Sequence, residues 1–116
     1  MPVGKSSRDK GARWERAIVT WLRANGHHYA ERRGAGFGSD TGGDIIGIPG
    51  LVVEAKDQAR WSVPAWWRQL ETEIEASPPG TIGALVIKRP GKPDPADALA
   101  VITLADFNEL FKGGTL

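Results

Sequence analysis

The stretch Gly43-Asp-Ile-Ile-Gly-Ile-Pro-Gly-Leu-Val-Val-Glu-Ala-Lys56 contains two short apolar runs on either side of a Pro-Gly pair. This pattern predicts a β-hairpin with strands over residues 44–48 and 51–56. Side chains alternate along a strand, so Glu54 and Lys56 share one face. Asp44 joins that face only if the turn has an odd length, as in Ile48-Pro49-Gly50 with Gly50 in the left-handed conformation. A two-residue Pro-Gly turn would place Asp44 opposite Ala55 instead, and the sequence leaves both registers open.

Helices and strands are expected on both sides of this hairpin. Before it, apolar residues recur at helical spacing over residues 10–25 as far as Gly26, and a short strand is expected over 28–33. After it, we expect a helix from Ser62 to the 77–80 segment, strands over 82–88 and 99–103, and a last helix. Thr103 and Asp106 resemble a capping box for that helix, with its apolar side chains facing inward: Phe107, Leu110 and Phe111. The order α-β-β-β-α-β-β-α predicts an α/β fold with a mixed central sheet flanked by helices.

The length and composition predict one folded domain. The chain has 116 residues, of which 41% are hydrophobic and 25% are charged, so it can bury a core. We expect a flexible basic tail over residues 1–9 and a single domain over 10–116. The absence of cysteine excludes disulfides, zinc–thiolate sites and cysteine nucleophiles. No apolar run approaches the roughly 20 residues of a membrane span, so a reducing, cytoplasmic location is expected.

Charge is unevenly distributed along the chain, although the formal net charge is only +1. Residues 1–33 carry eight basic and three acidic side chains, whereas residues 34–76 carry three basic and seven acidic ones. A basic segment beside an acidic centre suits a protein that holds phosphates near a metal site. The alternative is a solvated basic helix face, which the charge pattern taken alone favours.

Asp44, Glu54 and Lys56 are the candidate catalytic residues of the hairpin. Two carboxylates a few ångströms apart repel each other unless a proton or a cation lies between them. Hard oxygen ligands favour Mg²⁺ or Mn²⁺, which would polarise a phosphate and lower the pKa of a bound water. Ordinary surface charges at a strand end are the alternative.

Glu15 is a further candidate, on the expected first helix. At roughly 100° per residue it lies about 20° around the helix from Leu22, at the rim of the apolar stripe. A carboxylate that leans toward a core face is more informative than an exposed one. The alternative is an ordinary ion pair with Arg13 or Arg16.

The combined pattern resembles the PD-(D/E)XK nucleases. It consists of Lys10-Gly11-x-x-x-Glu15-Arg16 on a helix, a Gly/Ser-rich loop, Gly43-Asp44-Ile-Ile, and Val53-Glu54-Ala-Lys56. Within that superfamily it is most similar to the small archaeal-type and bacteriophage Holliday junction resolvases, over about residues 10–90. The resemblance implies a restriction-endonuclease-like αβββαβ core, with an extra C-terminal strand and helix in this chain. Gly43 departs from the pattern, because the family has a proline before the aspartate.

The resemblance also implies roles for the matching residues. Asp44 and Glu54 would bind Mg²⁺ together with the backbone carbonyl of Ala55, and Mn²⁺ could substitute. Lys56 would serve the attacking water, and Glu15 would support the metal site directly or through water. Gln69 would be an accessory residue, with a plain solvent-edge glutamine as the alternative. DNA contacts are expected from basic side chains and one loop serine: Lys10, Arg13, Arg16, Arg32, Arg33, Ser39 and Arg60.

These features together predict a Mg²⁺-dependent endodeoxyribonuclease that resolves four-way DNA junctions by phosphodiester hydrolysis. A junction is resolved by two matched nicks, so a homodimer is expected. No membrane partner is expected, and no nucleotide cofactor, because the glycine-rich loop lacks a Gly-Lys-Ser/Thr ending. The alternatives are another PD-(D/E)XK nuclease (a nickase, flap or repair enzyme) and an inactive DNA-binding module of the same fold. A sheet-based protein-interaction domain would leave the basic segment unexplained.

Overall fold

The computed structural model describes residues 3–33 and 43–112 of the chain. In chain order the elements are α1 (Val3–Ala24), β1 (Glu31–Arg32), β2 (Ile45–Ile46), β3 (Leu51–Lys56), α2 (Val63–Glu75), β4 (Ile82–Ile87), the 3₁₀ helix η2 (Pro95–Asp97), β5 (Leu99–Val101) and α3 (Leu104–Phe111). No helix in the described ranges has the length and apolar character needed to cross a bilayer.

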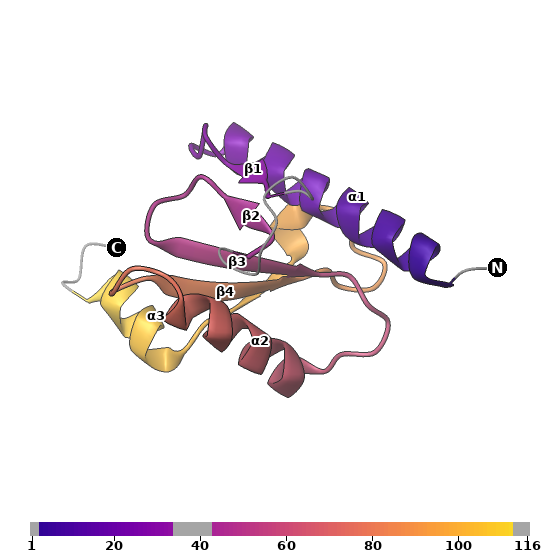
Figure 1. Cartoon of the computed structure of the whole chain (residues 1–116). Helices are drawn as coiled ribbons and strands as arrows, with labels where there is room; N and C mark the ends of the chain where they lie inside the picture. Colours follow the sequence, from indigo (N-terminus) through magenta and orange to yellow (C-terminus); the bar gives the residue numbers. More distant parts are fainter. Residues whose placement is uncertain (1–2, 34–42, 113–116) are drawn as a thin grey trace.

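The strands form one five-stranded mixed sheet in the order β1-β2-β3-β4-β5. Only β3 and β4 run parallel, because α2 connects them as a crossover; the other neighbours are antiparallel. α1 lies over one face of the sheet and α2 over the other (Figure 1). The predicted α/β class, with a mixed sheet flanked by helices, is therefore confirmed.

The hairpin has the odd-length register. Ile45 pairs with Val53, the register of an odd-length turn, and Asp44 directly precedes β2. The backbone N–H of Asp44 donates to the Val53 carbonyl at 2.8 Å. Gly50 has φ +80°, so the left-handed residue expected at the end of the turn is present.

Residues on opposite faces of β3 enter two core clusters. Val53 packs with α1, in a cluster with Trp14, Ile18, Val19 and Ile45. Val52 packs under α2, in a cluster with Trp66, Leu70, Leu85 and Ile87. Because side chains alternate, Glu54 and Lys56 lie on the α2 face, at the carboxyl end of β3.

α1 is longer than the sequence pattern predicted. It begins at Val3, so residues 3–9, which were expected in an N-terminal tail, continue the helix. Extending an existing helix adds one hydrogen bond per residue, and the polar residues of this segment are tolerated in a helix. Trp21 on this helix is 38% exposed, although its neighbours Ile18 and Val19 are buried.

The C-terminal elements are partly as predicted. The Thr103 hydroxyl accepts from the Asp106 backbone N–H at 3.0 Å, as expected of a helix cap. The prediction that the apolar side chains of α3 face inward is wrong: Leu104 is 81% exposed, and Phe107, Leu110 and Phe111 are also exposed. Phe107 and Phe111 pack on each other, with ring centroids 4.8 Å apart. Local capping thus determines where α3 begins, but it does not bury the helix in the core.

Candidate functional site

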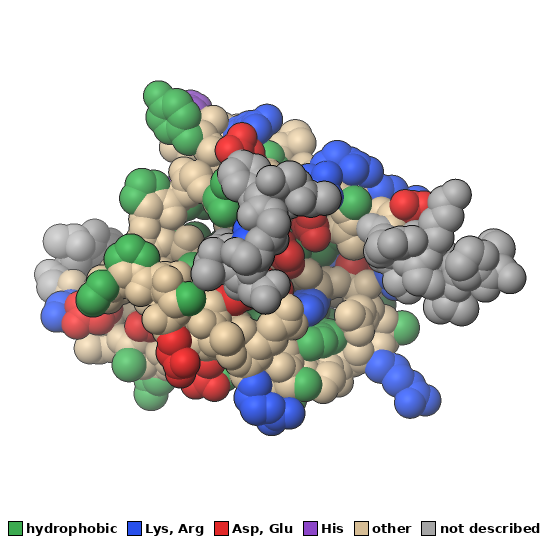
Figure 2. Space-filling model, viewed as in Figure 1, with side chains coloured by type: hydrophobic (Ala, Val, Ile, Leu, Met, Phe, Trp, Pro, Cys, Tyr) green, Lys and Arg blue, Asp and Glu red, His purple; other side chains and the backbone are tan. Residues whose placement is uncertain are grey.

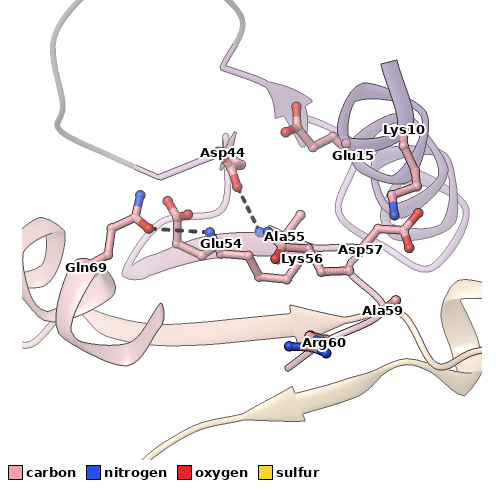
Figure 3. Close-up of a pocket in the computed structure, with 12 residues that line it drawn as sticks. Lys10, Glu15, Asp44, Glu54, Ala55, Lys56, Asp57, Ala59, Arg60 and Gln69 are labelled. Carbon is pink, nitrogen blue, oxygen red and sulfur yellow. Dashed lines mark hydrogen bonds between the residues drawn. The ribbon is translucent and has the colours of Figure 1, made fainter. Parts of the chain in front are cut away.

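Most of the predicted site residues line one hollow of about 510 Å³ at the carboxyl end of β3, hereafter the acidic hollow. β3 and the segment after it supply much of the wall, and α1, α2 and Asp44 supply the rest (Figure 3). The predicted residues that it brings together are Lys10, Glu15, Asp44, Glu54, Ala55, Lys56, Arg60 and Gln69. The remaining lining residues are Gly11, Asp57, Gln58 and Ala59.

Asp44 is held rigidly by the edge of β3. Its Oδ2 accepts a hydrogen bond from the Ala55 backbone N–H at 2.9 Å (Figure 3). β2 begins only at Ile45, so at this point the side chain of Asp44 bonds to β3. The N–H and C=O of one strand residue point to the same side, so the Ala55 carbonyl is directed toward Asp44 as well. The Lys56 carbonyl points the other way, because it accepts from the Lys88 backbone N–H at 2.9 Å. The predicted carbonyl ligand therefore lies on the side of β3 where it is needed.

Gly43 is the reason that Asp44 can approach β3 so closely. Its φ is +72°, a conformation closed to proline and strained for other residues. A Cβ on Gly43 would lie 2.6 Å from the Val53 carbonyl oxygen. A glycine at position 43 is thus required by this backbone.

Glu54 is buried, with 3% of its surface exposed, and it contacts a second buried carboxyl group, Glu73 on α2. Burial, followed by the hydrogen bond with Glu73 and the charge of Asp44, raises the pKa of Glu54 to about 10. The pKa of Glu73 is also raised, chiefly by burial. Without a proton between the two groups, Oε2 of Glu73 has no hydrogen-bond donor among the described residues. In the absence of a cation, the raised pKa of Glu54 favours its protonated form, whose hydroxyl would donate a hydrogen bond to Glu73.

Glu73 is a functional candidate that the sequence analysis missed. It lies in the buried stripe of α2, between Leu70 and Ile74, and is 7% exposed. The signal that singled out Glu15, a carboxylate within an apolar helical stripe, was present here too. Applied to α2, the same test would have found it.

A second hollow, of about 350 Å³, lies on the α2 side of the same carboxylates. It is lined by Arg33, Gly43, Asp44, Glu54, Gln69, Thr72 and Glu73. The positive charge of Arg33 lowers the pKa of Glu73 and so opposes the effect of burial. Arg33, predicted to contact DNA, thus lies beside the acidic pair.

Lys56 is positioned by two groups on α2. Its Nζ donates to the Gln69 side-chain oxygen at 3.4 Å (Figure 3). The same Nζ lies 5.7 Å from the centroid of a Trp66 ring. The predicted accessory residue Gln69 therefore contacts the predicted catalytic lysine.

Glu15 reaches the acidic hollow from α1, on the other face of the sheet. Its carboxylate pairs with Arg32 on β1 at 3.0 Å, rather than with the Arg13 or Arg16 of its own helix. Burial raises the pKa of Glu15, the hydrogen bond with Arg32 lowers it, and the charge of Asp44 raises it further. Arg32, predicted as a DNA contact, thus has at least one structural role.

The other predicted DNA contacts are distributed around the site. Arg13 and Arg16 are exposed on α1 and do not line the acidic hollow. Ser39 lies outside the described residues. In Figure 2, Lys and Arg side chains gather along α1, beside acidic side chains at the centre of the same face. The separation of charge predicted from the sequence is therefore visible on one face of the molecule.

The residues present fit a hard divalent cation that binds partly through water. Within residues 3–33 and 43–112, no three acidic or histidine side chains form a ready metal cage. The available donors are the carboxylates of Asp44 and Glu54 and the Ala55 carbonyl, all oxygen atoms of the type that Mg²⁺ prefers. Burial and the neighbouring charges of Asp44 and Glu73 raise the pKa of Glu54, and a cation beside these carboxylates would offset the repulsion between them.

The chain was compared with models of known families, with curated proteins and with solved structures, and nothing matched. The resemblance to the PD-(D/E)XK nucleases stays a prediction from the motifs.

Proposed function

We propose that this protein is a Mg²⁺-dependent DNA endonuclease of the PD-(D/E)XK type that cleaves four-way junctions. One observation carries the proposal: Asp44, Glu54 and Lys56 line one hollow together with Glu15, which comes from a distant helix on the other face of the sheet. Three separate motifs of the sequence thus meet at one place, as a shared chemical task requires.

The carboxylates of Asp44 and Glu54 would hold the cation together with the Ala55 carbonyl. Bound there, Mg²⁺ or Mn²⁺ would polarise the scissile phosphate and make a bound water nucleophilic near neutral pH. The bond from the Ala55 N–H to Asp44 keeps one carboxylate oxygen in place. Glu73 would accept the proton of Glu54, or release it to solvent, when Glu54 becomes a ligand.

Lys56 would orient the attacking water or the phosphate from the same face as Glu54. Gln69 and Trp66 hold its ammonium group at the edge of the hollow, so its position costs little entropy on substrate binding. Glu15 would bind the outer waters of the cation, and its ion pair with Arg32 at 3.0 Å would hold the carboxylate in place.

The junction substrate is supported by the basic side chains around the acidic hollow. Lys10 and Arg60 line it, and Arg13 and Arg16 extend the positive surface along α1. Two matched nicks require two such sites in fixed relation, so we propose a two-fold homodimer. The exposed apolar side chains of α3 offer a surface that a second copy would bury.

The decisive experiment incubates the protein with a labelled four-way junction, a matched duplex and a flap, with and without Mg²⁺. We expect Mg²⁺-dependent cleavage of the junction, abolished by Asp44→Asn and by Glu54→Gln but unchanged in the exposed control Glu109→Gln. Junction binding should survive in both inactive variants, since affinity comes mainly from basic side chains on phosphates. Added Mg²⁺ should also raise the Tm of the wild type but not that of Asp44→Asn.

Cleavage by either site variant at saturating Mg²⁺ would refute the site assignment. Preferred cleavage of the flap would move the proposal to a repair nuclease. Binding of the junction without cleavage by any Mg²⁺- or Mn²⁺-loaded protein would leave an inactive DNA-binding module.

A further inference from the structure

A basic hollow adjoins the acidic hollow at the carboxyl ends of β3 and β4. It measures about 480 Å³ and is lined by Lys10, Asp57, Gln58, Ala59, Lys88, Arg89, Pro90 and Gly91. Lys10 and the segment 57–59 line both hollows, so the two are adjacent. The loops that follow β3 and β4 lie together at one end of the sheet, near the first half of α1 (Figure 1). The carboxyl ends of parallel strands are a common place for ligand binding.

Arg89 is presented in this hollow by a rigid turn. The Lys92 N–H donates to the Arg89 carbonyl at 3.0 Å across Pro90-Gly91, and Gly91 has φ +72°. Proline followed by a left-handed glycine is the sequence of a type II turn. The turn is also tied to the candidate active site, because the N–H of Lys88 bonds to the carbonyl of Lys56.

The three basic side chains of the hollow differ in their existing contacts within the protein. Lys88 pairs with Asp57 at 3.6 Å and lies 5.9 Å from the centroid of a Trp14 ring. Arg89 is exposed and Lys10 is half-buried, and within the described ranges neither makes an ion pair. Lys10 and Arg89 are thus available for an anion, and Lys88 fixes the segment after β3 to the segment after β4.

We propose that the basic hollow binds a DNA backbone phosphate next to the phosphate held in the acidic hollow. This inference rests on the proposed function and extends it to residues outside the nuclease motifs. A strand that enters the acidic hollow meets the carboxylates of Asp44 and Glu15, which repel a phosphate that lacks a cation. The neighbouring phosphate therefore needs its own positive group, and Arg89 supplies a planar donor that matches two phosphate oxygens.

The experiment measures binding of a fluorescent four-way junction by anisotropy, in EDTA, between 50 and 200 mM salt. We expect Arg89→Ala to weaken binding about 3- to 10-fold. The fall of log K with log salt concentration should also become less steep, by about 0.9 in slope. Arg89→Lys should keep most of that slope, because the charge is retained. The matched control is Lys112→Ala, which removes an exposed charge at α3, at the opposite end of the molecule (Figure 1); it should bind as the wild type does.

The possible failures are distinguishable. If the wild type binds the junction and Arg89→Ala binds equally well, or no worse than Lys112→Ala, the basic hollow is not a phosphate site while the proposed function stands. If the wild type binds no DNA at any of these salt concentrations, in EDTA or in Mg²⁺, the proposed function fails and this inference fails with it.

Discussion

Replacement of Gly43 by alanine should separate two effects of a glycine, backbone freedom and close packing. Gly43 has φ +72°, and an added Cβ would lie 2.6 Å from the Val53 carbonyl oxygen and 2.9 Å from Cγ1 of Val52. Gly50 provides the matched control, since it has φ +80° and a Cβ there would meet nothing within 4 Å. Both glycines belong to the same hairpin, so only the close contact differs.

The left-handed conformation costs alanine about 1–2 kcal/mol, and the stiffer unfolded chain offsets roughly 0.4–1 kcal/mol of that cost. We therefore expect Gly50→Ala to lower the free energy of unfolding by about 1 kcal/mol. Gly43→Ala adds the overpacking of a Cβ against backbone, about 1–3 kcal/mol, for a total of about 2–4 kcal/mol. At about 4 °C per kcal/mol for a chain of this size, the Tm should fall by about 4 °C and by about 8–16 °C, respectively.

The assay is thermal unfolding by circular dichroism, followed by junction cleavage at a temperature where both variants are folded. The Val53 carbonyl that a Cβ would push against also accepts the bond that places Asp44, at 2.8 Å. Cleavage should therefore fall in Gly43→Ala and stay near the wild-type rate in Gly50→Ala. Equal losses of Tm in the two variants would refute the close approach of Gly43 to β3.

Three further outcomes are expected. Because the pKa values of Glu54 and Glu73 are raised in the folded state, the stability that their protons provide is complete below pH about 4.5 and is lost as the pH rises toward about 10. Urea unfolding in EDTA should therefore show a free energy of unfolding that declines from pH 5 to 9, and this decline should be shallower in Glu73→Gln. An equal decline in the two proteins would contradict a proton shared by the two carboxyl groups. Glu15→Gln should lower the cleavage rate more than the junction affinity, measured by single-turnover kinetics and anisotropy, and the reverse result would make Glu15 only a partner of Arg32. Light scattering at micromolar concentration should find a dimer that Leu104→Lys weakens, whereas a strictly monomeric wild type would exclude the proposed assembly.

Several features of the candidate site could be predicted from local sequence alone. Alternation along β3 places Glu54 and Lys56 on one face in any fold that contains this strand, and helical spacing brings Glu15 to the rim of its stripe. The cap at Thr103 is equally local, because the hydroxyl and the N–H that it accepts from are three residues apart. The sequence narrowed the register of the hairpin to two choices, and the structure has the odd-length one.

Other features were decided only by the packing of elements that are distant in the chain. The crossover through α2 sets Glu73 against Glu54 and Gln69 against Lys56, and the pairing of β1 with β2 gives Glu15 the partner Arg32. The apolar pattern of α3 predicted burial, but burial requires a neighbouring surface, and the pattern does not specify one. Sequence periodicity reports which side of an element is apolar or charged, because that depends on residues a few positions apart. Which groups meet across the sheet depends on the order and direction of the strands, and these arise from the tertiary structure.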